Sequence, residues 1–503
     1  MHLPLRTCAA VALSLLLSFA LTHVHAQALK IGSKRFTESY ILAELLAQTA
    51  RQAGAAAEVR QGLGNTAIVH AALRSGSIDL YPEYLGTIDR EILGNTRPHS
   101  LAEIRAQLQP LGLGVDIPLG FNDGYALAMR GETAKRLGIR RLADLAAHPA
   151  LRLGLSNEFI GRADGWPGLA ARYSLPQKPS GLDHGLAYDA LAAGQIDVID
   201  IYTTDAKIAQ LGLTVLADDD AYFPRYDAVV LYRLDVPQRF PAAWAALRKL
   251  ERSIDEPAMI AMNARAELQG VGFEQIARDR LAGAATMAGG GGAMDKLLGP
   301  DLARLTAQHL GLVLAAVCAA VLIGVPLAVL AAPRPGPRAL LLGAASLLQT
   351  VPSIALLAVL ISLTNRIGAV PALVALTLYA LLPIMRNCCT GLAEVPAGLK
   401  DAATALGLTP VQRLVHIELP LAMPTLVAGI RTATSITVGT ATIAAFIGAG
   451  GYGERIVTGL ALNDRGLMLA GALPSAALAL AFEGLFGLLA WWLFRSRAAV
   501  PAR

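Results

Sequence analysis

Tyrosine is concentrated in the first half of this 503-residue chain, where ten of its twelve tyrosines lie between residues 40 and 232. Two occur in the stretch IDLYPEYLGT, residues 78–87, and the stretch GQIDVIDIYTTD, residues 194–205, repeats its order of strand and tyrosine. The face of an aromatic ring attracts a cation by about 0.5–2 kcal/mol. One such tyrosine in each of two lobes would place rings on both sides of a cleft.

The elements that would position these rings alternate between strands and helices. ALKIGSK, residues 28–34, is typical of a strand, and the apolar periodicity that follows predicts a helix over residues 37–54. Strands separated by helices of this length predict parallel sheets with ligands at the strand ends. The segment 27–284 is long enough for two lobes, and we expect the second lobe at about residues 119–224.

The second half of the chain has a different composition. The whole sequence is 54% hydrophobic and only 16% charged, which is too apolar for a wholly soluble protein. From about residue 305 onward, long apolar blocks alternate with short polar loops, and each block can span a lipid bilayer. The five predicted spans are residues 305–332, 339–363, 368–386, 424–449 and 467–494.

Charges in the loops predict how the spans are oriented. The loop after the first span carries Arg334 and Arg338 and no acid, and the C-terminal tail carries three arginines. The positive-inside rule therefore places both on the cytoplasmic side of the inner membrane, with the first half of the chain on the periplasmic side. Residues 1–26 are typical of an export signal, with an uncleaved anchor as the alternative.

Several classes of protein are disfavoured. The net charge of +5 is small, and no basic run is interleaved with aromatic residues, so we expect no nucleic-acid partner. The four cysteines are Cys8, Cys318, Cys388 and Cys389, which leaves none within residues 28–285 for a disulfide. The adjacent pair lacks partners at metal-ligand spacing, and we expect no metal site.

The long loop at residues 390–423 is expected on the cytoplasmic face. Small residues and one acid, Asp401, Ala402 and Ala403, lie on a short predicted helix that ends near Gly407. A short helix on such a loop is suited to docking into another protein. The alternative is a surface helix along the membrane, for which its apolar face is small.

This loop resembles the EAA motif of ABC-importer permeases, the coupling helix that fits a groove on the cytoplasmic ATPase. Asp401 stands where that family usually has Glu. The stretches at residues 347–360 and 379–387 are similar to the quaternary-amine branch of these importers. The residues that match the coupling motif are Asp401, Ala402, Ala403, Gly407, Ile417, Leu419 and Pro420.

The chain contains no GxxxxGK[ST] phosphate-binding loop. The resemblance therefore implies that ATP is hydrolysed on a separate ATPase subunit, so that this chain is not an enzyme, has no catalytic residues and carries no cofactor. It also implies that two copies of the chain form one permease.

The first half resembles the periplasmic binding proteins for quaternary amines, in motifs that include IGSKRFTESY, FNDGYALAM and DVIDIYTTD. The resemblance implies a type II-like, two-lobed binding-protein fold with a small quaternary amine as ligand. It implies a cation cage of Tyr84, Tyr125, Tyr202 and Tyr226 with Asp123 adding negative charge, and a carboxylate site of Lys34, Thr87 and Arg162.

The sequence thus predicts a binding domain at 27–284, a Gly-rich tether at 285–300 and an all-α permease domain at 301–503. The hypothesis is ATP-driven uptake of a betaine osmoprotectant. Choline, carnitine or ergothioneine remain alternative substrates, and a betaine-sensing membrane receptor or a secondary transporter remain alternative functions.

Two charges fall inside predicted spans, Arg431 in the fourth and Glu483 in the fifth. Charges within the membrane are costly and are usually paired or functional. Two interpretations remain open: the residues pair with each other, or each is buried separately at a subunit interface.

Overall fold

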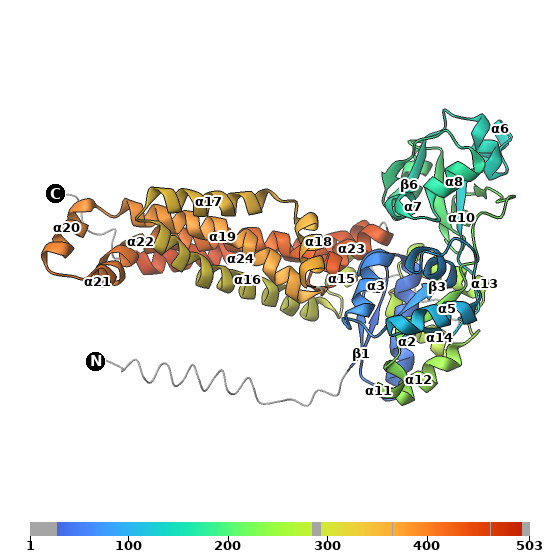
Figure 1. Cartoon of the computed structure of the whole chain (residues 1–503), viewed down its shortest axis with the longest axis horizontal. Helices are drawn as coiled ribbons and strands as arrows, with labels where there is room; N and C mark the ends of the chain where they lie inside the picture. The colour runs from blue at the N-terminus through green and yellow to red at the C-terminus, as the bar shows by residue number, and fades with distance from the viewer. Residues whose placement is uncertain (1–27, 284–292, 365, 463, 495–503) are drawn as a thin grey trace.

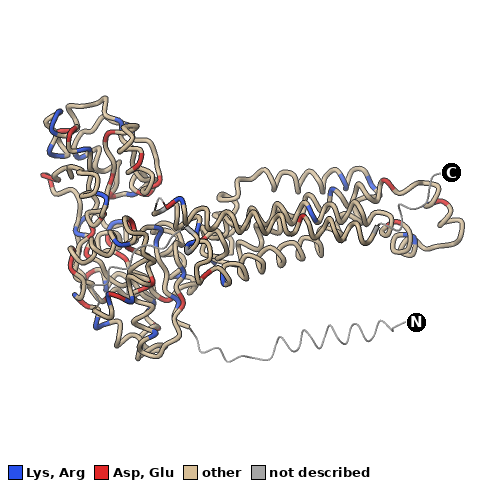
Figure 2. Tube along the Cα trace, turned by 180° about the vertical axis from the view of Figure 1, so that it is seen from behind, with Lys and Arg blue, Asp and Glu red and all other residues tan. Residues whose placement is uncertain are grey.

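The computed structural model describes residues 28–283, 293–364, 366–462 and 464–494. Two α/β lobes lie at one end of an elongated bundle of helices (Figure 1). Lys, Arg, Asp and Glu are frequent in the lobes and sparse along the bundle (Figure 2). The predicted export signal and the C-terminal tail lie outside the described residues, as does the first half of the predicted tether.

The first lobe is built on a five-stranded sheet in the order β2-β1-β3-β10-β4. Both faces of this sheet are buried, because one apolar cluster includes Leu29 and Leu80 while another includes Tyr81 and Leu231. The strands are β1 (Leu29–Gly32), β2 (Ala57–Arg60), β3 (Leu80–Tyr84), β4 (Leu113–Asp116) and β10 (Ala228–Arg233).

Helices from both ends of the binding domain cover the first sheet (Figure 1). Local signals fix where they begin: Asn65 caps α3, and Ser100 and Glu103 form a capping box at α5. The helices are α2 (Thr37–Gln52), α3 (Thr66–Arg74), α4 (Leu85–Thr87), α5 (Leu101–Leu108), α11 (Val236–Arg239), α12 (Pro241–Leu247), α13 (Glu256–Glu267) and α14 (Phe273–Ala282).

The second lobe contains the other five-stranded sheet, in the order β7-β6-β8-β5-β9. Its strands are β5 (Tyr125–Arg130), β6 (Leu153–Ser156), β7 (Ser180–Leu182), β8 (Val198–Tyr202) and β9 (Leu213–Val215). Its helices are α6 (Gly131–Leu137), α7 (Asn157–Gly161), α8 (Trp166–Tyr173), α9 (His184–Ala192) and α10 (Lys207–Gln210).

The prediction of wholly parallel sheets is wrong for one strand in each lobe. β10 runs antiparallel to both β3 and β4, and β5 runs antiparallel to both β8 and β9. These two strands are the first that the chain forms after each crossing between the lobes. The crossing brings the chain in at the edge where the parallel strands end, so the new strand must run in the opposite direction.

The membrane half is all α-helical, and the prediction of a two-lobed α/β domain followed by such a half is confirmed. Within the described residues, four helices are long and apolar enough to cross a membrane, or five if α17 and α18 form one bent span. The helices are α15 (Ala293–Leu297), α16 (Leu302–Ala331), α17 (Pro335–Thr350), α18 (Ser353–Thr364), α19 (Ala369–Glu394), α20 (Ala397–Ala405), α21 (Pro410–Arg413), α22 (Leu419–Thr440), α23 (Gly453–Leu462) and α24 (Arg465–Phe494).

The span predicted at 339–363 consists of two helices, α17 and α18, which meet at an angle of 100°. Pro352 explains the break. A proline disfavours helical geometry in the residue before it, and Val351 is extended with φ −65° and ψ 128°.

The binding domain is packed directly against one end of the bundle. Ile367, in the turn before α19, is buried in the same apolar cluster as Leu63 and Ile78 of the first lobe. The guanidinium of Arg35 lies 4.4 Å from the ring centre of Phe446. The lobes and the bundle therefore share a packed interface in addition to their covalent connection.

The described part of the predicted tether is ordered against the bundle. Residues 293–297 form the short helix α15, and Lys296 makes an ion pair with Asp464 at the start of α24. This portion of the predicted tether is therefore held against the membrane domain by an ion pair.

We predict that Ile367→Asp detaches the lobes from the bundle, because a buried, unpaired carboxylate costs several kcal/mol. A protease site inserted between residues 284 and 292 provides the measurement. After cleavage, the lobes of the parent chain should remain with the bundle during size-exclusion chromatography, whereas those of the variant should separate.

Arg366→Asp is the matched control, since this neighbouring side chain is exposed. Equal retention of the lobes in both variants and the parent would contradict the assignment of Ile367 to the interface.

Candidate ligand-binding site

The four tyrosines of the predicted cage come from strand ends and from the crossings between the lobes. Tyr84 ends β3, Tyr125 begins β5 and Tyr202 ends β8. Tyr226 lies in the second crossing, two residues before β10. Tyr125 and Tyr202 face each other as a cross-strand pair of the antiparallel strands β5 and β8, so the sheet register itself brings two of the rings together.

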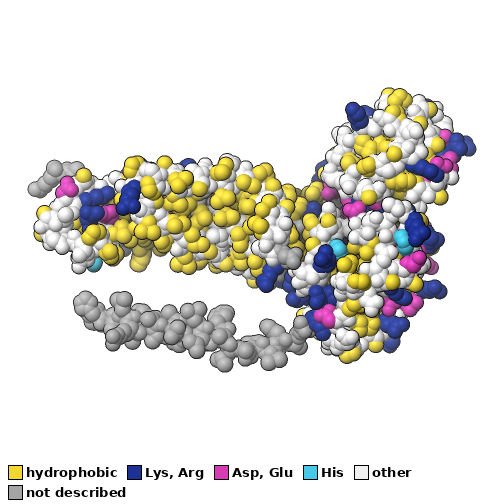
Figure 3. Space-filling model, in the orientation of Figure 1, with side chains coloured by type: hydrophobic (Ala, Val, Ile, Leu, Met, Phe, Trp, Pro, Cys, Tyr) yellow, Lys and Arg dark blue, Asp and Glu magenta, His cyan; other side chains and the backbone are white. Residues whose placement is uncertain are grey.

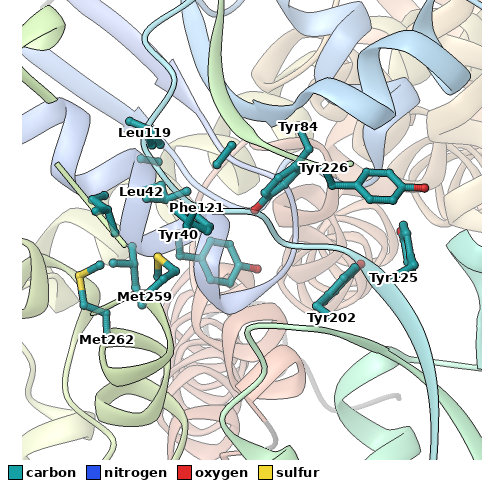
Figure 4. Close-up of a cluster of buried hydrophobic side chains, with 14 of the residues drawn as sticks. Tyr40, Leu42, Tyr84, Leu119, Phe121, Tyr125, Tyr202, Tyr226, Met259 and Met262 are labelled. Carbon is teal, nitrogen blue, oxygen red and sulfur yellow. The ribbon is translucent and has the colours of Figure 1, made fainter. Parts of the chain in front are cut away.

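The rings of these tyrosines lie near one another. The centroid of Tyr125 is 5.2 Å from that of Tyr202 and 5.6 Å from that of Tyr226, which it meets edge-on at 79°. Figure 4 shows Tyr84, Tyr125, Tyr202 and Tyr226 grouped together, with Tyr40 apart from them. All four are nine-tenths or more buried.

Phe36 completes the aromatic group, although sequence reasoning did not assign it. Its ring centroid lies 6.2 Å from Tyr84 in the first lobe and 5.0 Å from Tyr202 in the second. It stands two residues after Lys34 in the motif IGSKRFTESY, which was the available signal. Phe36 links the two lobes through ring contacts.

The phenols of the cage remain neutral. Burial raises the pKa of each of Tyr84, Tyr125, Tyr202 and Tyr226 well above its ordinary value, and nearby carboxylates add to the effect for Tyr84 and Tyr226. The group therefore presents neutral ring faces, the form that attracts a cation through the ring quadrupole.

Two buried carboxyl groups lie beside the rings. The Thr204 hydroxyl oxygen is 2.6 Å from a carboxylate oxygen of Glu38 and 2.9 Å from one of Asp123. Tyr84 donates a further hydrogen bond of 2.5 Å to Glu38. Because a hydroxyl has one proton, Thr204 can donate to only one acid, and the other contact requires a protonated carboxyl group.

The pKa values agree with this arrangement. Burial raises the pKa of Glu38 to about 7. Burial, followed by the proximity of Glu38, raises the pKa of Asp123 well above its ordinary value. The two acids therefore share less than two full negative charges near neutral pH. Asp123 was predicted from the sequence, whereas Glu38 and Thr204 were not.

The three residues predicted to hold a carboxylate lie in two places. Arg162 donates a hydrogen bond of 3.3 Å to Thr87, and its guanidinium lies 5.1 Å from the ring centre of Tyr125. Lys34 is separate from this pair, with its ammonium 5.0 Å from the ring centre of Tyr84. The structure thus joins Thr87 and Arg162 and places Lys34 next to a different ring.

Both cations already have acidic partners within the chain. Lys34 contacts Glu83 at 2.5 Å, and Arg162 donates two hydrogen bonds of 2.7 Å to Asp164 through Nε and Nη2. Tyr226 also donates to Asp164, at 2.7 Å. The remaining terminal nitrogen of Arg162, Nη1, has a carboxylate of Glu158 at 3.7 Å, beyond hydrogen-bond distance.

The lobes are closed around this site. Thr66 of the first lobe donates a 2.9 Å hydrogen bond to Glu158 of the second. Further polar contacts join Thr204 to Glu38 and Arg162 to Thr87. The cavity beside Phe36, Glu38 and Tyr202 has a volume of about 30 Å³, which is room for only one or two water molecules. A larger compound can enter this cavity only if the lobes separate.

His184 packs on the outer side of the cage, with its ring centroid 4.5 Å from that of Tyr202. Burial alone would lower its pKa, but Asp205 at 3.0 Å and Asp200 outweigh this effect and raise the pKa to about 9. An imidazolium ion therefore supports one wall of the cage at neutral pH. No sequence pattern singled out this histidine.

The residues of the coupling motif lie elsewhere, at the end of the bundle far from the lobes (Figure 1). On α20, Asp401 and Ala402 are exposed while Ala403 is buried. Gly407 follows this helix with φ +81°, a conformation that favours glycine. Ile417 lies in the turn before α22, and Leu419 and Pro420 are the first two residues of that helix.

Comparison with known proteins identifies both halves. Residues 27–282 match the family described as the substrate binding domain of ABC-type glycine betaine transport systems. Residues 324–494 match the family described as the inner membrane component of binding-protein-dependent transport systems.

Three relatives illustrate these matches. An osmoprotectant import permease protein of Salmonella typhimurium is 45% identical over 37% of this chain and 87% of its own. A glycine-betaine-binding protein of Pseudomonas aeruginosa is 33% identical over 52% of this chain and 90% of its own. An ergothioneine transport permease and binding protein of Helicobacter pylori is 32% identical over 54% of this chain and 51% of its own.

We predict that the binding domain becomes less stable as the pH rises from about 6.5 to 9. His184 has a raised pKa in the folded state. Its stabilising contribution is therefore complete below its unfolded pKa of about 6.5 and is lost as the pH rises through the folded value. The expected loss is on the order of 1–3 kcal/mol, or several degrees in Tm.

The measurement is the thermal unfolding of the full chain in detergent between pH 6 and 9.5, compared with His184→Gln. The difference in Tm between the two proteins should shrink as the pH rises. A difference that is independent of pH would show that His184 is uncharged in the folded protein.

Proposed function

The chain belongs to the substrate-binding family of ABC-type glycine betaine transport systems, and from this premise we propose that its lobes capture a quaternary amine and deliver it to the membrane helices of the same chain. The observation that carries the proposal is the cross-strand pair of Tyr125 and Tyr202, with Tyr84 and Tyr226 beside it. The activity is ATP-driven uptake of an osmoprotectant, with glycine betaine as the leading substrate.

The chemistry of the cation explains the use of rings. A trimethylammonium group has no N–H to donate, so hydrogen-bond acceptors cannot select it. Ring faces attract it by about 0.5–2 kcal/mol each, and the attraction increases when water is excluded. A small hydrated cation would lose more hydration free energy on entering the cage than its attraction to the rings restores. The partial charge shared by Glu38 and Asp123 adds attraction for the same end of the ligand.

The carboxylate of a betaine would bind at Arg162 and Thr87. Asp164 uses Nε and Nη2 of Arg162, which leaves Nη1 to donate a charge-assisted hydrogen bond. The Thr87 oxygen accepts from Arg162, so its own proton can be donated to the ligand. Lys34 contributes less, because Glu83 neutralises it at 2.5 Å.

Closure of the lobes would then be the step that traps the ligand in the site. Glu38 and Thr204, and likewise Thr87 and Arg162, come from opposite lobes and meet only in the closed form. Because the lobes also pack against the bundle through Ile367, opening and closing takes place next to the entrance of the permease.

The proposed assembly contains two copies of this chain and two ATPase subunits. The lobes lie outside the membrane and α20 lies in the cytoplasm, where Asp401 and its neighbours contact the ATPase. Large apolar side chains are exposed around this helix, with Leu406 80% and Val411 69% exposed. Such exposure is typical of a surface that another protein covers.

A histidine-derived betaine such as ergothioneine is the second candidate substrate. The relative from Helicobacter pylori is named as a permease and an ergothioneine-binding protein in one chain, and its match extends over 54% of this chain. Choline and carnitine share the trimethylammonium group and would use the same cage.

We predict that Tyr202→Ala weakens the binding of glycine betaine by about 2- to 30-fold, since one ring wall is worth about 0.5–2 kcal/mol. Isothermal titration calorimetry on the full chain, with glycine betaine, choline, carnitine and ergothioneine as probes, measures the change and the substrate preference together.

Tyr232→Ala is the control, because this tyrosine packs against Trp244 at 4.3 Å, away from the cage. If Tyr202→Ala binds every probe as tightly as the parent chain, the cage is assigned to the wrong residues. If the parent chain binds none of them, the proposed function is wrong.

A separate prediction concerns coupling. Asp401→Lys should abolish ligand-stimulated ATP hydrolysis by the complex while leaving ligand affinity within about twofold, because the reversed charge opposes docking but lies far from the cage. Lys178→Asp, on the binding domain, is the control for charge reversal. Normal stimulation in Asp401→Lys would exclude α20 as the ATPase contact.

A further inference from the structure

An ion pair lies inside the membrane half of the chain. Arg431 of α22 donates to Glu483 of α24 through Nε at 2.5 Å, and Ser435 donates to the same carboxylate at 3.1 Å. Arg431 is about 18 Å along the helix from Leu419, given a rise of 1.5 Å per residue. The pair therefore lies near the middle of two membrane-spanning helices, and the interpretation of two separately buried charges is wrong.

The pair is not enclosed by the chain itself. The side chains of Arg431 and Glu483 are 42% and 40% exposed. Charged groups are costly against lipid and are found next to water-filled cavities or other protein chains. The position of this ion pair is therefore unsuited to lipid.

The side chains that α16 and α22 expose differ in size and polarity. The second half of α16 exposes large apolar side chains, such as Leu322 and Leu330, which are 74% and 75% exposed. Figure 3 shows hydrophobic side chains covering the visible face of the bundle. On α22, by contrast, the exposed positions between residue 428 and the end of the helix are Ala428, Thr432 and Gly439. The α16 side suits lipid, and the α22 side suits an aqueous path.

We propose that Arg431 and Glu483 form a transit site for the zwitterionic ligand, on a path that crosses the membrane between two copies of the chain. Glu483 receives the trimethylammonium group and Arg431 receives the carboxylate. The inference rests on the proposed function, because it requires that a betaine is the compound transported.

The chemistry of the pair fits a passing ligand. A betaine carries the same two charges as the ion pair, so each residue can exchange its partner for the opposite end of the ligand. Arg431 and Glu483 already pair with each other, so exchanging that contact for contacts with the ligand yields little net binding free energy. A path needs a site that binds weakly enough to release its ligand.

The test is uptake by the full chain with its ATPase in membrane vesicles, with glycine betaine and choline as probes. Glu483→Gln should reduce uptake of both probes at least tenfold. Arg431→Gln should reduce uptake of glycine betaine at least fivefold more than uptake of choline, which has no carboxylate. Binding of glycine betaine to the lobes should stay within twofold of the parent value.

The double variant Arg431→Gln/Glu483→Gln separates transit from a structural role. If the pair only joins two helices, removing both charges leaves no unpaired ion, and uptake returns to the parent level. That recovery would overturn the proposal, as would unchanged uptake in both single variants. A transit site predicts that the double variant stays at least tenfold impaired.

Thiol labelling gives a second readout that does not depend on variants of the pair. In a chain with Cys318→Ser, Thr432→Cys should react with a membrane-impermeant thiol reagent, and glycine betaine should slow the reaction. Leu322→Cys on α16 should stay unlabelled. Equal labelling at the two positions would overturn the proposal. Failure of the parent chain to bind either probe would instead refute the proposed function, and labelling would still show whether this face is aqueous.

Discussion

The pairing of β5 with β8 is the constraint on which the proposed binding site depends. It sets Tyr125 opposite Tyr202 in the second lobe, and the other two rings, Tyr84 and Tyr226, approach from the first lobe and from a crossing between the lobes. A cage assembled in this way exists only when the lobes are closed. Closure would therefore raise the selectivity of the proposed site, since an open cleft would bring fewer of the four rings together than the closed one.

The charges around the rings suit a ligand whose positive end is its distinguishing feature. Lys34 and Arg162 are matched by Glu83 and Asp164, whereas the shared charge of Glu38 and Asp123 has no basic partner among these residues. The cage thus offers ring faces and an excess of acid to a quaternary ammonium group. A carboxylate is left with the hydrogen bonds of Arg162 Nη1 and Thr87, enough to orient a betaine without dominating its binding. At the end of the bundle far from the lobes, α20 exposes the surface through which ATP hydrolysis would be coupled to this closure.

Much of this organisation follows from local sequence, and the remainder depends on contacts between distant segments. The four tyrosines were identifiable because each lies in a stretch that resembles a binding-protein motif, and the membrane spans because apolar length alone sets them. The break at Pro352 follows from the effect of a proline on the residue before it, but a span assigned by apolar length alone does not show this break. The antiparallel strands β5 and β10 could not be recognised without the two crossings. Glu38 and Thr204 are 166 residues apart, and only the closed lobes bring them together. His184 likewise owes its charge to Asp205 and Asp200, and no sequence pattern shows that these two residues lie beside it.

The most direct measurement of the central claim is a structure of the full chain bound to glycine betaine, with its lobes closed. The account predicts that the trimethylammonium group lies within about 6 Å of the ring centres of Tyr125 and Tyr202, and that the carboxylate faces Arg162 and Thr87. A ligand bound with its trimethylammonium group outside the four tyrosines, or with its carboxylate toward Glu38 and Asp123, would contradict it.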